Sequence, residues 1–228
     1  MRKVVIALIL LAIMAPAINA RRPKDKAGLF KDNVYRDKKY DFELTVPDGW
    51  KCKVMKNDDS FRFTLIQNSF EIPSYYIDAP DYTQIPRTVV FVDTTSMSAR
   101  VFLDSLVAEN YRSKQKKEIL KEFDILSSQS AGSGMTREDV VSRKKKRLNV
   151  NKLKGMYWTG QVNYRNEVAE SSSSVNAAKR VHGALGGLIV TIKKENTIMV
   201  FHTICEWTYF EGIRGQMLDM VNTLKWGE

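Results

Sequence analysis

Residues 187–226 read GLIVTIKKENTIMVFHTICEWTYFEGIRGQMLDMVNTLKW, and this stretch decides the fold. Two apolar, β-rich segments, Leu188–Ile192 and Ile198–Cys205, flank a polar turn, which is the pattern of a β-hairpin. A helix is predicted to open at Thr208, with Glu211 at the spacing of a capping box. Its apolar residues recur at helical spacing: Phe210, Ile213, Met217, Met220, Val221 and Leu224. A hairpin followed directly by such a helix is expected to bury the two apolar faces against each other.

The first twenty residues have the order of a secretory signal peptide. Arg2 and Lys3 precede the apolar run Val4–Ala15, and small residues follow up to Ala20. The alternative is an uncleaved anchor, but the run is shorter than the roughly 20 apolar residues of a spanning helix. We therefore predict export to the periplasm or the medium, a mature chain starting at Arg21, and no later transmembrane segment.

The charge of the chain is strongly basic and restricts the partners that it can attract. Lysine and arginine number 36 against 26 acidic residues, a net charge of +10. Loss of Arg2 and Lys3 with the signal peptide lowers this charge by two, to +8. A basic, exported protein favours anionic lipid, polysaccharide or an acidic protein surface. Nucleic acid is not expected as a physiological partner, because export separates the protein from it.

The remaining chain is predicted to be one α+β domain. Residues 21–33 form a flexible lead-in, and residues 34–228 form the domain, with a long polar loop at about 165–186. The strand patterns are mostly joined by turns, which predicts an antiparallel sheet with helices packed on it. The predicted strands before the hairpin include Val34–Val46, Phe61–Gln67, Thr88–Asp93 and Met156–Tyr164, and a helix runs from Ser98 to about Tyr111.

The most unusual local feature is the basic run Arg143, Lys144, Lys145, Lys146 and Arg147. Five consecutive cations suit a salt-sensitive contact with an anionic surface. In a strand their side chains alternate between both faces, so binding would require an exposed edge or a loop. The alternative is a solvated charge run that protects a sheet edge from aggregation.

The two cysteines and two histidines of the chain do not form a recognisable catalytic or metal-binding motif. Cys52 and Cys205 can form a disulfide in an oxidising compartment, or they can remain two partly buried thiols. His202 lies inside an apolar strand pattern, and His182 lies in the polar loop beside Arg180. No motif of a hydrolase, a zinc peptidase or a phosphate-binding loop is present. The sequence therefore predicts no catalytic residue, no metal site and no cofactor.

Four segments, taken in order, resemble the PsbP-like proteins of the Mog1/PsbP superfamily. They are an aromatic strand ending in Pro-x-x-Trp (Phe42–Trp50), a first helix (Ser98–Leu106), a central strand (Gly155–Trp158), and the closing hairpin and helix (Leu188–Trp226). The resemblance implies an α/β/α sandwich around an antiparallel sheet and a role in binding a protein partner. The basic run and the segment Ser171–Ser174 match no motif of that family, and no plastid transit peptide precedes the domain.

We therefore expect an exported, non-enzymatic binding or accessory module that acts through a protein partner in the cell envelope. One alternative is a basic module that binds anionic lipid or polysaccharide surfaces. A second alternative is an enzyme with an unrecognised site.

Overall fold

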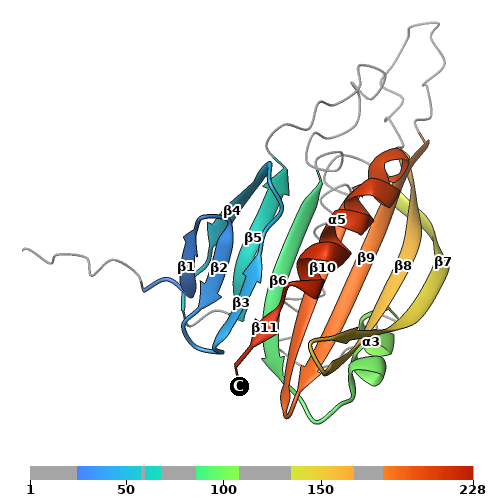
Figure 1. Cartoon of the computed structure of the whole chain (residues 1–228). Helices are drawn as coiled ribbons and strands as arrows, with labels where there is room; N and C mark the ends of the chain where they lie inside the picture. Colours follow the sequence, from blue (N-terminus) through green and yellow to red (C-terminus); the bar gives the residue numbers. More distant parts are fainter. Residues whose placement is uncertain (1–24, 58–59, 68–85, 108–134, 167–181, 228) are drawn as a thin grey trace, which may run out of the picture.

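The computed structural model describes residues 25–57, 60–67, 86–107, 135–166 and 182–227 (Figure 1). Several predictions fall on residues outside these ranges. They are the signal peptide, the end of the helix predicted to reach about Tyr111, and most of the predicted polar loop, including Ser171–Ser174. No described helix is long and apolar enough to cross a membrane.

The closing stretch has the predicted order. Strand β9 (His182–Lys194) pairs antiparallel with β10 (Thr197–Glu206), and helix α5 (Phe210–Asn222) follows a short 3-10 helix, η3 (Trp207–Tyr209). The predicted capping box is wrong. The Glu206 side chain accepts from the Thr208 backbone N–H at 2.8 Å, because the helical segment begins with η3 at Trp207 and its capping residue is Glu206 instead of Thr208.

A seven-stranded antiparallel sheet forms the centre of the molecule, in the order β4-β5-β6-β10-β9-β8-β7. The closing hairpin lies near its middle, and β4 and β7 are its edges. The predicted strand Phe61–Gln67 is confirmed, and Thr88–Asp93 and Met156–Tyr164 lie within longer strands. The bounds are β4 Trp50–Val54, β5 Phe61–Gln67, β6 Arg87–Thr94, β7 Met135–Val150 and β8 Leu153–Asn166.

The two main helices pack on opposite faces of this sheet, as Figure 1 shows. Helix α5 covers β9 and β10 on one face, called here the α5 face, where its predicted apolar residues are buried. Helix α3 (Ala99–Val107) covers β8 and β9 on the other, the α3 face, through Phe102, Leu103 and Leu106. The predicted α+β class, an antiparallel sheet with helices packed on it, is therefore confirmed.

A second, four-stranded sheet extends the α5 face, in the order β1-β2-β3-β11. Its Tyr35, Phe42 and Leu44 join the same core as the α5 residues. Val34–Val46 is not one strand as predicted but a hairpin, because the chain turns back before Asp41, which has φ 48°. The bounds are β1 Gly28–Lys31, β2 Val34–Asp37, β3 Phe42–Thr45 and β11 Lys225–Trp226.

Part of the predicted lead-in 21–33 is folded. Residues 28–31 form β1, which pairs with β2, and Ala27 is fully buried. Gly28 is required there because a Cβ would lie 2.3 Å from the Arg36 carbonyl oxygen. The prediction of a flexible lead-in was based on the composition of the segment, and composition does not show this close approach of two backbone segments.

The predicted polar loop at 165–186 is too long at both ends, since β8 continues to Asn166 and β9 begins at His182. Gly186 and Gly187, directly before Leu188, are part of β9, where each makes room for an aromatic ring. A Cβ on Gly186 would lie 2.1 Å from the Phe210 ring, and one on Gly187 would lie 3.2 Å from the Trp158 ring. Glycine therefore occurs here because the neighbouring aromatic rings leave no room for a side chain, and not because the segment is a flexible loop.

Candidate functional site

The predicted basic run lies on β7, which is an edge strand of the seven-stranded sheet. Its partner on one side is β8, with Lys145 opposite Trp158 and Arg147 opposite Met156. Lys144, Lys145, Lys146 and Arg147 are all exposed. Arg143 belongs to the same strand. The run therefore has the edge position that binding requires, and the same position also suits protection of a sheet edge.

The cations of the run divide between the two faces of the sheet. Cross-strand partners share a face, so Lys145 and Arg147 lie on the α3 face with Trp158 and Met156. Lys144 and Lys146 lie on the α5 face, on the side of Tyr157. The Lys145 ammonium forms an ion pair with Asp104 of α3. Three exposed cations of the run, Lys144, Lys146 and Arg147, have no ion pair to any described residue.

The tertiary structure adds two lysines to the α3 face. Lys154 of β8 lies directly opposite Lys193 of β9, and Arg147 lies diagonal to Lys154 across the β7–β8 pair. Like charges in directly opposite positions repel each other. The Lys193 ammonium donates to the Thr95 carbonyl, and partial burial lowers its pKa. The positive charge of the β7 edge therefore continues across β8 to β9.

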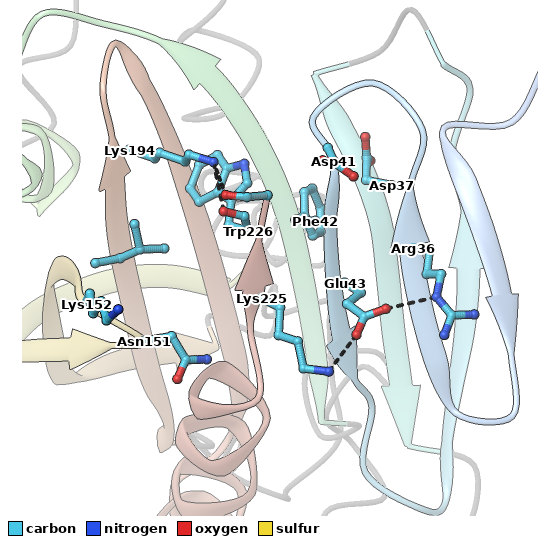
Figure 2. A pocket seen from close by; sticks show the side chains of 12 residues that line it. Arg36, Asp37, Asp41, Phe42, Glu43, Asn151, Lys152, Lys194, Lys225 and Trp226 are labelled. Carbon is cyan, nitrogen blue, oxygen red and sulfur yellow. Dashed lines mark hydrogen bonds and ion pairs between the residues drawn. The ribbon is translucent and has the colours of Figure 1, made fainter.

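An open pocket of about 920 Å³ lies between the four-stranded sheet and the β7–β8 turn. Figure 2 shows Arg36 and Lys225 approaching Glu43 from opposite sides, at 2.9 and 2.8 Å. These hydrogen bonds, first that from Lys225, lower the pKa of Glu43. Two of the pocket's cations are therefore already paired with one of its carboxylates.

The remaining polar groups of the pocket mostly hold the C-terminal strand β11. The Lys194 ammonium donates to the carbonyls of Trp226 at 2.8 Å and Gly227 at 2.5 Å. Asn151 donates to the Leu224 carbonyl at 2.6 Å, and the Trp226 indole donates to the Tyr40 carbonyl at 2.9 Å. The pocket is thus built by contacts that attach the end of the chain, and we assign it a structural role.

A fully buried ion pair joins the two sheets. Arg62 of β5 contacts Asp37 of β2 through two N–H groups, at 2.7 and 3.1 Å, and both side chains have 0% exposure. Asp37 also accepts from the Tyr35 hydroxyl at 2.8 Å, and Arg62 donates to the carbonyls of Asn57 and Ala27. Burial, and then Asp37, raise the pKa of Tyr35. These satisfied groups form an internal clamp with no access for a ligand.

The disulfide proposed between Cys52 and Cys205 is not formed, and both thiols are free. Cys52 lies on β4 and Cys205 on β10, three strands away in the sheet. At about 4.8 Å per strand the Cα atoms are about 14 Å apart, against the roughly 4–7 Å of a disulfide. Burial raises the pKa of Cys52 to about 12 and also raises the pKa of Cys205, so both remain protonated thiols at neutral pH.

His202 is a strand-face residue, as predicted. It is 4% exposed on β10, and burial lowers its pKa to about 3, so it is neutral at physiological pH. His182 begins β9 and does not lie in the loop that we predicted. Within the described ranges, no group of three or more histidine, cysteine or acidic residues lies together in a way that could hold a metal ion.

Sequence reasoning found the basic run but missed what surrounds it. Lys154 and Lys193 are 39 residues apart in the chain and meet only through the β8–β9 register. The pairing of Lys145 with Asp104 depends on where α3 lies on the sheet. Lys193 lies in the polar turn that we predicted between Leu188–Ile192 and Ile198–Cys205, so no sequence signal linked it to Lys154 or to the basic run.

Solved structures similar to this chain include PsbP and Mog1 proteins. Cyanobacterial PsbP (CyanoP) of Synechocystis sp. PCC 6803 is 9% identical, with 88% of this chain and 95% of that chain covered and a TM-score of 0.42. LpqN of Mycobacterium tuberculosis, described as involved in cell envelope biogenesis, is 9% identical, with 81% and 82% covered and a TM-score of 0.41. The Ran-binding protein Mog1p of Saccharomyces cerevisiae is 9% identical, with 81% and 89% covered and a TM-score of 0.38.

No protein-family model and no curated protein sequence matches the chain.

Proposed function

We propose that this protein is an exported, non-enzymatic binding module that recruits an acidic protein partner in the cell envelope through the basic edge strand β7. The observation that carries the proposal is the row of exposed cations, Lys144–Arg147, on a strand at the edge of the sheet. Protection from aggregation explains charged side chains on an edge strand, but it does not require charge on the neighbouring strand. Here the charge extends over four consecutive exposed residues and onto Lys154.

Several features of the described residues support a binding role over catalysis. The large buried polar groups, Arg62, Asp37 and Tyr35, are bonded to one another. The open pocket is crossed by contacts that hold β11. His202, a possible general base, is enclosed in the core and neutral.

An anionic lipid or polysaccharide surface is the alternative ligand. Cations project from both faces of β7, whereas a flat membrane would meet the cations of one face at a time. A protein partner that wraps around the edge can reach both faces. We therefore favour the protein partner.

The test compares capture of native envelope proteins by two matched variants at increasing salt. The first variant carries Lys144→Gln, Lys146→Gln and Arg147→Gln on β7, which leaves the Lys145–Asp104 pair intact. The control carries Lys51→Gln, Lys53→Gln and Lys56→Gln at the opposite edge of the sheet, where these lysines are also exposed. The two variants lose the same net charge and differ in the edge affected.

We expect a partner that the wild type and the control capture at low salt and release as salt rises, and that the β7 variant does not capture. Equal capture by the β7 variant would refute a role for this edge. Capture that depends only on anionic lipid or polysaccharide, and that is lost after these are removed, would favour the alternative ligand.

A further inference from the structure

We propose that the partner binds by strand addition: an extended, acidic polypeptide segment pairs antiparallel with β7 and becomes an eighth strand of the sheet. This inference rests on the proposed function, since it assumes an acidic protein partner. It adds the mode of binding and the sequence pattern that the segment must carry.

The outer side of β7 has the backbone groups that strand addition needs. β7 is hydrogen-bonded to β8 on one side and ends the sheet on the other. In an antiparallel pair, the N–H and C=O groups of alternate residues point away from the partner strand. Over Lys144–Asn149 no backbone bond to a described residue outside the strand pair occupies these groups. Figure 1 shows β7 as the last ribbon on its side of the sheet.

The charge on this edge selects the occupant. A second copy of β7 would place lysines and arginines opposite one another, and like charges in opposite positions disfavour pairing. An acidic strand would place carboxylates opposite the cations of β7, and its backbone would form hydrogen bonds with the outward N–H and C=O groups of β7. An anionic lipid or polysaccharide could neutralise the lysines but could not continue the backbone ladder.

The two faces of β7 impose a pattern on the added strand. Lys144 and Lys146 on the α5 face, and Arg147 on the α3 face, lack an ion pair to described residues and call for three acids opposite them. Lys145 is already paired with Asp104, so a neutral polar residue suffices there. Leu148 is half-buried beside the α5-face core and favours an apolar residue. Read from its N-terminus, the segment is apolar, acidic, acidic, polar, acidic.

A synthetic peptide tests this pattern directly. The probe is a fluorescent, end-capped heptapeptide of threonine, valine, glutamate, glutamate, threonine, glutamate and threonine, titrated with the purified protein. A scrambled peptide of the same composition controls for charge. Two further peptides carry N-methyl groups on one or the other set of alternate residues among the central five, because only one set directs its N–H groups at β7.

We expect the probe to bind more tightly than the scrambled peptide. One N-methylated peptide should lose about tenfold or more in affinity, since it removes two or three backbone hydrogen bonds, while the other should stay within about twofold. Lys146→Glu should weaken binding of the probe and improve binding of a peptide with lysine in place of its second glutamate, which faces residue 146 in the proposed register.

Three outcomes would overturn strand addition. Equal binding of the two N-methylated peptides, or of the probe and its scramble, would leave an acidic partner attracted by charge alone. Failure of the probe to bind, while the partner capture described above still depends on β7, would refute strand addition and keep the proposed function. Failure of both tests, with binding confined to anionic phospholipid vesicles, would refute strand addition and the protein partner together.

Discussion

The buried pair of Arg62 and Asp37 shows how two residues can connect two sheets. Each charge loses its water on folding, and the cost is offset by two direct N–H contacts together with bonds from Tyr35 and to the carbonyls of Ala27 and Asn57. Removing one member would leave the other buried and unpaired, which is more costly than never having had the pair. The clamp is therefore sensitive to substitution although it is remote from any proposed binding surface.

Asp37→Asn should destabilise the protein by about 3–5 kcal/mol, because the Arg62 guanidinium would remain buried without its carboxylate. Urea unfolding measures this cost. The matched control is Glu43→Gln, which removes a partly exposed carboxylate that also contacts two cations, and which should leave the unfolding curve nearly unchanged. An unchanged curve for Asp37→Asn would show that the carbonyl contacts alone satisfy Arg62.

The buried His202 should make stability depend on pH in a defined window. Its pKa falls from an ordinary 6.5 to about 3 in the folded protein, because burial disfavours the charged ring. The unfolded chain therefore binds a proton in this range that the folded chain does not, and stability should fall as pH falls from about 6.5 toward 3. Comparison of unfolding free energies at several pH values with those of His202→Gln isolates this contribution.

The wild type should lose more stability between pH 6.5 and 4 than His202→Gln does, whatever the offset between the two proteins at neutral pH. Carboxylates titrate equally in both proteins and cancel in the difference. Parallel curves over this window would mean that the ring is protonated within the fold.

Glycines in the closing element, β9 through α5, differ in what surrounds them. Gly215 lies inside α5, and apart from its chain neighbours and the surrounding helix backbone no atom lies within 4 Å of the position of its missing Cβ. Gly186 on β9 lies under the Phe210 ring at the start of the same helix. The same substitution should therefore have opposite effects at these two positions.

Gly215→Ala should stabilise the protein by about 0.5–1 kcal/mol, because alanine restricts the unfolded chain and favours the helix. Gly186→Ala should be destabilising, because the added methyl group displaces Phe210 and with it the first turn of α5. Thermal melts of the two variants give the comparison. A destabilised Gly215→Ala would indicate that this face of α5 is covered by another part of the molecule.

The folded domain includes part of residues 21–33, the segment whose composition predicted a flexible lead-in. Cleavage before Arg21 would leave β1 intact, since the strand begins at Gly28. It would also keep Ala27, whose carbonyl accepts from Arg62 at 3.2 Å. The predicted processing site and the fold are thus compatible.

The intact mass of the exported protein should correspond to a chain that starts at Arg21. A shorter chain starting at Val34 should melt well below it, because loss of β1 exposes Tyr35 and removes the Ala27 contact of Arg62. A chain starting at Asp25 is the control and should melt like the exported form. A full-length, membrane-bound species would contradict the signal peptide, and equal melts of the two shorter chains would contradict a structural role for β1.

The sequence by itself determined the elements whose buried residues follow a local pattern of apolar side chains. The hairpin within Leu188–Cys205 follows from two continuous apolar, β-rich runs around a polar turn, and the apolar faces of α5 and α3 follow from helical spacing. Both patterns depend on neighbouring residues alone. The antiparallel arrangement followed because short polar turns cannot make parallel crossovers. The basic run was visible because its five residues are consecutive.

Only the tertiary structure decided which residues that are distant in sequence lie close together in space. The edge position of β7, the juxtaposition of Lys154 with Lys193, and the clamp between Asp37 and Arg62 all depend on strand order and register. It also separated Cys52 from Cys205 by two intervening strands, and it placed residues 182–186 of the predicted polar loop in β9. These features depend on backbone pairing between strands that are far apart in sequence. Local secondary-structure propensities do not determine which strands will become neighbours.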